Sequence, residues 1–171
     1  MVERAQAATF KGNPLTLVGP ELKVGDQAPS FKLVGNDLSD VESGSFGGRV
    51  RVLSVAPSLD TPVCATQTRT FNKEAVSLSD DLVILSVSRD LPFALARFCG
   101  AEGIERVITA SDYKYTTFGE AYGVYIRELG LLSRAVFVIG KDDKIAYAEY
   151  VREVTREPDY EAALAAVRAA F

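Results

Sequence analysis

Runs of apolar residues of strand length mark the centre of the predicted fold. Residues 82–88 and 135–139 are largely apolar stretches, and residues 50–55 are rich in β-branched side chains. Such runs are typical of strands that are covered on both faces. Near the N-terminus, short β-prone runs at residues 9–11 and 15–18 flank a Gly-Asn-Pro cluster, which predicts a β-hairpin.

Apolar residues at helical spacing occur between these runs. Phe71, Ala75 and Leu78 fall at i, i+4 and i+7, and they predict a helix from about residue 62 to residue 78. Strands that alternate with helices predict an α/β fold with helices on both sides of a sheet. The other expected elements are short strands at 31–34 and 38–41, helices at 92–99 and 116–121, a strand at 144–151 and an Ala-rich helix at 160–170.

Composition sets the broad class of protein. The chain has 171 residues, 47% of them hydrophobic, with 19 Lys and Arg against 23 Asp and Glu and a formal net charge of −4. This length can bury a substantial core. Because no repeat, low-complexity tract or linker divides the chain, we expect residues 1–171 to form a single domain. The slightly acidic balance argues against nucleic acid or an anionic membrane surface as a partner.

The chain contains two cysteines and no histidine. Two cysteines cannot form a disulfide scaffold, and the lack of imidazole excludes Ser-His-Asp and Cys-His nucleophiles and most zinc, copper and haem sites. We therefore expect no metal or other cofactor, and any catalysis has to use Cys, Lys, Arg, carboxylates or backbone groups. No stretch approaches the roughly 20 apolar residues of a membrane-spanning helix. Residues 1–6 carry no apolar run typical of a secretory signal, so we expect a cytoplasmic protein.

Cys64 occupies the start of the helix that is predicted after residue 61. Thr61 is a good N-cap residue and Pro62 suits the first helical position, which places Cys64 in the first turn. The unpaired backbone N–H groups and the positive end of the helix dipole stabilise a thiolate there. Alternatively, Cys64 is a small buried hydrophobic residue on the same helix face as Phe71.

Cys99 lies at the end of the second predicted helix. Leu91, Leu95 and Phe98 form its apolar stripe, and Cys99 adjoins that stripe just before Gly100, a possible C-cap. Core packing is therefore the simplest explanation of this cysteine. An activated thiol and one further cysteine could nevertheless support a thiol-disulfide cycle without a Cys-x-x-Cys motif.

The sequence from Pro57 to Cys64, PSLDTPVC, resembles the Pro-x-x-x-Thr-x-x-Cys motif of peroxiredoxins, in the form found in the thiol peroxidase subfamily of atypical two-cysteine enzymes. Residues 90–94 and 97–99 resemble the segment with that subfamily's resolving cysteine, and residues 131–137 resemble its active-site arginine strand. The resemblance continues at residues 10–14 and 157–160, so it covers essentially the whole chain.

This resemblance implies a thioredoxin-like fold, with a central mixed sheet flanked by helices and an N-terminal β-hairpin. Composition alone would equally allow a flavodoxin-like sheet. The family also implies reduction of hydrogen peroxide and organic hydroperoxides, thioredoxin as the reductant, and a homodimer.

By the same resemblance, Cys64 is the peroxidatic cysteine, which becomes a sulfenic acid, and Cys99 is the resolving cysteine, which closes an intramolecular disulfide. Arg134 would stabilise charge on the sulfur and on the departing oxygen. Thr61 would orient the thiolate or the peroxide while also capping the helix. Without the family, Thr61 would be a plain N-cap and Arg134 a surface ion pair.

Three further residues complete the site that the resemblance implies. Pro57 and Pro62 would shape and shield the loop, while the backbone N–H of Val63 or Cys64 could bind peroxide oxygens. A disulfide needs Cα atoms within about 7 Å, so we expect local unwinding near Cys99 or Cys64 during each cycle.

Two other functions are compatible with parts of this pattern. A thioredoxin-like disulfide reductase is disfavoured because such proteins keep two cysteines three residues apart, and Cys64 has no such neighbour. A peroxide sensor would use the same bond between Cys64 and Cys99 to report oxidation to a partner protein.

Overall fold

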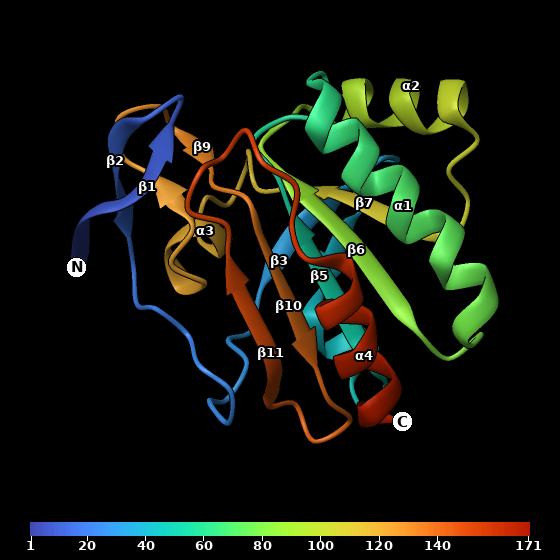
Figure 1. Cartoon of the computed structure of the whole chain (residues 1–171). Coiled ribbons are helices and arrows are strands. Elements are labelled where there is room, and N and C mark those ends of the chain that lie inside the picture. Colours follow the sequence, from blue (N-terminus) through green and yellow to red (C-terminus); the bar gives the residue numbers. More distant parts are fainter.

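The computed structural model describes the backbone of residues 1–171 and the side chains of every residue except Val76. Its centre is a seven-stranded sheet in the order β11-β10-β5-β6-β7-β3-β4 (Figure 1). The strands of this sheet are β3 (Lys32–Gly35), β4 (Asp40–Glu42), β5 (Arg51–Val55), β6 (Val83–Ser88), β7 (Val107–Ser111), β10 (Ala135–Ile139) and β11 (Ile145–Tyr150).

The pairing directions in this sheet are mixed. β5, β6 and β7 are parallel to one another, whereas β10 and β3 run antiparallel to the strands beside them. A flavodoxin-like parallel sheet is thereby excluded, and the predicted mixed sheet is confirmed.

The N-terminal hairpin consists of β1 (Glu3–Phe10) and β2 (Asn13–Val18), which continue into a small sheet with β8 (Tyr125–Ile126) and β9 (Leu131–Leu132). Its turn contains only Lys11 and Gly12, with φ of 49° and 83°. Both angles are positive, as in the type I′ turn, which matches the twist of the flanking strands. The hairpin is confirmed, but Asn13 and Pro14 lie in β2 and not in the turn.

Helices cover both faces of the large sheet (Figure 1). The helices α1 (Pro62–Leu78), α2 (Pro92–Glu102) and α4 (Tyr160–Ala170) pack on one face, and the short α3 (Phe118–Ala121) lies on the other. Alternate residues of the inner strands point into two apolar clusters, as period-two alternation dictates. One cluster lies on the face covered by α1 and α4 and includes Val52, Ile84 and Val136. The other lies on the face covered by α3 and includes Leu53, Leu85 and Phe137.

The end of α2 differs from the prediction. Gly100 does not cap the helix, because α2 continues to Glu102 and ends at Gly103, whose φ is 64°. The N–H groups of Gly103 and Ile104 both donate to the carbonyl of Cys99. A left-handed residue with this bonding ends a helix, and glycine adopts that conformation without strain. Among the described residues, no helix is long and apolar enough to cross a membrane.

Candidate active site

Cys64 lies in the first turn of α1, just beyond the end of β5, and its side chain is completely buried. Ala56, Leu59 and Leu95 pack around it. Thr61 holds the N-cap position with extended backbone angles, and Pro62 begins the helix as predicted. The helix start therefore confirms the local geometry that the sequence predicts for this cysteine.

The Thr61 side chain does not cap the helix. Its hydroxyl donates to the carbonyl of Ser58 at 2.9 Å, within a turn that the Thr61 N–H also closes onto the same carbonyl. The expected dual role is wrong in this respect, because the tight turn before α1 brings a carbonyl to the hydroxyl. The Thr61 hydroxyl consequently accepts no bond from the first-turn N–H groups, and Thr61 contributes to the helix start only through its backbone carbonyl, which accepts from the Ala65 N–H.

Arg134 directly precedes β10 and reaches the sulfur of Cys64. Its Nη2 lies 3.2 Å from Cys64 Sγ, and only 2% of its surface is exposed. Nη2 and Nε both donate to the carbonyl of Val154, at 2.8 and 3.0 Å, and Nη1 donates to Gln67 Oε1 at 2.8 Å. Arg134 is therefore an interior residue fixed from three directions, not part of a surface ion pair.

Sequence reasoning did not identify the two residues that hold Arg134. Gln67 is fully buried on α1, and its Nε2 also donates to Ser54 Oγ at 2.6 Å. Gln67 lies three residues after Cys64, and this spacing alone places both side chains on the same face of α1, which could have identified Gln67 as a neighbour of the site. Val154 acts through its backbone carbonyl, so its residue type carries no signal.

A pocket of about 300 Å³ lies beside this arrangement. It brings together Pro57, Thr61, Pro62, Val63 and Arg134, all of which the sequence singles out. The remaining walls come from the hairpin turn and from the segment after β11, through Phe10, Lys11, Val154 and Thr155. Among the described residues, no group of three or more His, Cys, Asp or Glu could hold a metal ion.

Glu153 joins these two walls. Its carboxylate accepts bonds from the hydroxyl and N–H of Thr155 and from the Gly12 N–H and the Thr9 hydroxyl. Led by the Thr155 hydroxyl, these donors lower the pKa of Glu153 from 4.5 to about 2. Since the folded-state pKa is depressed, the stabilisation by this carboxylate is present above pH 4.5 and is lost as pH falls towards 2.

A second carboxylate fixes the loop that leads to Cys64. Asp90 accepts bonds from Ser58 Oγ at 2.7 Å, the Leu59 N–H at 2.8 Å and Ser88 Oγ at 2.9 Å. These bonds connect the loop before α1 to the loop before α2. Asp90 belongs to the segment that resembles the resolving-cysteine region, but the sequence did not indicate this role.

Cys99 is half-buried on α2 and is a free thiol, as is Cys64. Its sulfur contacts Thr109 Oγ1 at 3.3 Å and Asn36 Nδ2 at 3.7 Å. The two cysteines belong to different apolar clusters. The structure therefore gathers the other predicted site residues around Cys64 but leaves Cys99 engaged elsewhere.

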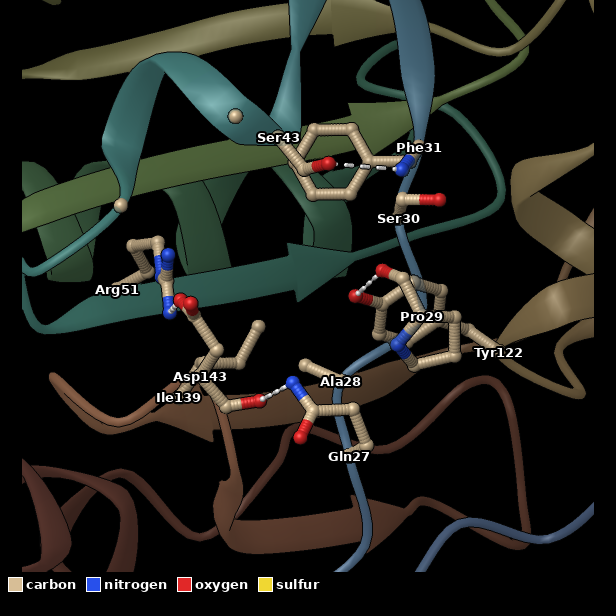
Figure 2. Close-up of a pocket in the computed structure, with 12 residues that line it drawn as sticks. Gln27, Ala28, Pro29, Ser30, Phe31, Ser43, Arg51, Tyr122, Ile139 and Asp143 are labelled. Atoms are coloured by element: carbon tan, nitrogen blue, oxygen red, sulfur yellow. Dashed lines mark hydrogen bonds and ion pairs between the residues drawn. The ribbon is translucent and has the colours of Figure 1, made fainter.

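Figure 2 shows a different cavity of about 300 Å³, which lies at the opposite end of β5. Arg51 at its edge is buried, donates to the carbonyls of Phe46 and Gly140, and forms an ion pair with Asp143. These bonds tie the loop before β5 to the turn between β10 and β11. Its lining residues, all of which the structure describes, include neither Arg134 nor any residue of the segment 57–63. The pocket beside Arg134 contains both, and Arg134 contacts the Cys64 sulfur, so that pocket is the candidate site.

Comparison with known proteins gives consistent matches. The sequence profile of the Redoxin family matches residues 23–164. A thiol peroxidase of Halalkalibacterium halodurans is 55% identical over 95% of this chain and 98% of its own, and one of Bacillus subtilis is 53% identical over 94% and 96%. A peroxiredoxin-like protein of Aquifex aeolicus is 44% identical, with a TM-score of 0.91 over 98% of both chains. This likeness confirms the expected thioredoxin-like architecture.

Proposed function

Since this chain belongs to the thiol peroxidases of the Redoxin family, and is thus a peroxiredoxin enzyme, we propose that it reduces hydrogen peroxide and organic hydroperoxides with Cys64 as the attacking group. One observation carries the assignment of this residue. Cys64 lies in the first turn of α1, and the guanidinium of the buried Arg134 contacts its sulfur at 3.2 Å. Both features stabilise a thiolate.

In the first step, the Cys64 thiolate attacks the terminal oxygen of the hydroperoxide. A sulfur–oxygen bond forms, the oxygen–oxygen bond breaks, and the departing alkoxide or hydroxide takes up a proton, leaving a sulfenic acid. Arg134 is placed to stabilise negative charge that moves from sulfur to the leaving oxygen. Thr61 and the backbone of Val63, which line the pocket, are the candidates for orienting the peroxide.

The pocket walls favour organic hydroperoxides. Phe10, Pro57, Pro62, Val63 and Val154 are apolar, and the volume of about 300 Å³ exceeds what hydrogen peroxide needs. Apolar walls stabilise an alkyl group through burial but contribute little to binding hydrogen peroxide. Because the sulfur has no exposed surface, side chains of the pocket have to shift before it meets the substrate.

In the second step, Cys99 attacks the sulfenic acid of Cys64. A sulfur–sulfur bond forms, the sulfur–oxygen bond breaks, and water leaves with the thiol proton. Thioredoxin, as an external dithiol, then reduces the disulfide. The family resemblance supports this reductant and a homodimer of single-domain chains spanning residues 1–171. A cycle that starts from two free thiols suits the reducing cytoplasm.

Mass spectrometry after one equivalent of peroxide tests this cycle. We expect a loss of two hydrogens, with the peptides of Cys64 and Cys99 linked. A chain that keeps two separate thiols, or one that only gains oxygen, would contradict the disulfide step. Turnover with a thioredoxin system is the companion measurement, because a sensor would be oxidised once and then recycle slowly.

Arg134→Lys is expected to lower the second-order rate constant for peroxide by about a hundredfold, which is typical for the loss of a charge-stabilising donor. Lysine keeps the charge, but one nitrogen cannot contact Cys64, Gln67 and Val154 together. Stopped-flow measurement of Cys64 oxidation gives the rate constant. The matched control is Arg69→Lys at an exposed position on α1, and equal rate constants for both variants would remove Arg134 from the mechanism.

A further inference from the structure

The sulfur of Cys99 belongs to a closed ring of three polar side chains. Asn36 Nδ2 lies 3.7 Å from Cys99 Sγ, which lies 3.3 Å from Thr109 Oγ1. The Thr109 hydroxyl in turn donates to Asn36 Oδ1 at 2.6 Å. The three residues come from separate elements, since Cys99 is on α2, Thr109 is on β7, and Asn36 is in the turn between β3 and β4.

The direction of each bond in this ring follows from its chemistry. An amide oxygen only accepts, so the one hydroxyl proton of Thr109 is committed to Asn36. Thr109 Oγ1 can then only accept a proton from the Cys99 thiol, and the amide of Asn36 donates to the sulfur. All three donors point the same way around the ring, an arrangement in which the bonds reinforce one another. The ring therefore requires Cys99 as a protonated, reduced thiol.

The ring also holds the C-terminal turn of α2, where local unwinding is expected before Cys99 can form a disulfide with Cys64. Cys99 lies near the end of the helix, and its carbonyl accepts the N–H groups of Gly103 and Ile104 that close the helix terminus. Thr109 is buried in the large sheet. Backbone and side chain together thus hold this cysteine against β7, in a different apolar cluster from that of Cys64.

We propose that Asn36 and Thr109 are positioning residues that keep the Cys99 thiol docked against β7, and that opening of their ring limits the rate of disulfide formation with Cys64. This inference rests on the proposed role of Cys99 as the resolving cysteine. Once the sulfur is bonded to Cys64 it has no proton for Thr109, so the ring closes again only after reduction. If the hydrogen bonds of the ring are weaker, the disulfide between Cys99 and Cys64 forms faster. If they are stronger, the Cys64 sulfenic acid persists longer and is more exposed to oxidation by a second peroxide.

Alkylation measures release of Cys99 without any peroxide chemistry. In a Cys64→Ser background, Cys99 is the single thiol, and its rate of reaction with iodoacetamide reports how often it leaves the ring. Thr109→Val removes the hydroxyl but keeps the β-branched shape, and we expect alkylation to become about fivefold faster, as for the loss of one net hydrogen bond. Thr109→Ser keeps the hydroxyl and should stay within about twofold of the parent. Asn36→Ala, on a different element, should match Thr109→Val.

The second measurement follows disulfide formation after a single addition of peroxide, in chains that keep both cysteines. Thr109→Val and Asn36→Ala should form the disulfide about fivefold faster relative to Cys64 oxidation, and should accumulate less sulfinic acid. The double variant with both substitutions should form the disulfide no faster than either single variant, because each substitution already opens the same ring.

Three outcomes would overturn parts of this scheme separately. Equal alkylation rates for Thr109→Val and the parent would show that the ring does not hold Cys99. Faster alkylation without faster disulfide formation would show that release is not the slow step. Absence of any disulfide between Cys64 and Cys99 in the unmodified chain would refute the proposed function itself, while alkylation would still report on the ring.

Discussion

Cys64→Ser is expected to have no measurable peroxidase activity. A serine hydroxyl stays protonated at the pH values where a thiolate forms, and it is a far weaker nucleophile towards oxygen. Serine is also close to cysteine in shape, so the buried site beneath Leu59 and Leu95 should still fold. The measurement is peroxide consumption with the thioredoxin system, alongside the thermal unfolding midpoint.

The matched control for this change is Cys99→Ser, which removes the other thiol without touching the contact with Arg134. It is compared in a single turnover, where the control should consume one peroxide per chain and Cys64→Ser none. Substantial peroxide consumption by a folded Cys64→Ser chain would place the chemistry on a different residue. The assignment of the pocket beside Arg134 would then fail with it.

Cys99→Ser is expected to consume a single peroxide per chain and then stop. Oxidation of Cys64 depends on the helix start and on Arg134, neither of which involves Cys99. Without a second thiol, no intramolecular disulfide forms, and the sulfenic acid is exposed to further oxidation to sulfinic acid. Mass spectrometry should show added oxygen atoms in place of the loss of two hydrogens.

Steady-state turnover of Cys99→Ser with thioredoxin decides between this outcome and the core-packing interpretation of Cys99. Cycling at the parental rate would show that the enzyme works with one cysteine. Cys99 would then have a structural role only, through its contacts with Thr109 and Asn36 and its packing in the apolar core.

The sequence predicted best those features that residue type and spacing determine locally. The bounds of α1 follow from helical periodicity and from Thr61 and Pro62 at its start, and those of α4 follow from its Ala-rich composition. The motif from Pro57 to Cys64 and Arg134 indicated the candidate site through resemblance, and Pro57, residues 61–63 and Arg134 line one pocket in the structure.

Features that depend on tertiary contacts were not predictable in this way. β7 was missed because Thr109 and Ser111 interrupt its apolar pattern, although both are buried. The support of Arg134 by Val154 uses a carbonyl that every residue possesses. Which of Gly100 and Gly103 ends α2 depends on the backbone angles that packing selects.

The long span of chain between Arg134 and its partners bears on how the protein is synthesised. Arg134 lies 70 positions after Cys64, and the Val154 carbonyl that fixes it lies another 20 further on. Contacts between such distant positions form late in folding, because a long loop has to close first. A nascent chain therefore emerges from the ribosome with Cys64 still outside its arginine contact, and the pairing completes only after residue 154 has also emerged.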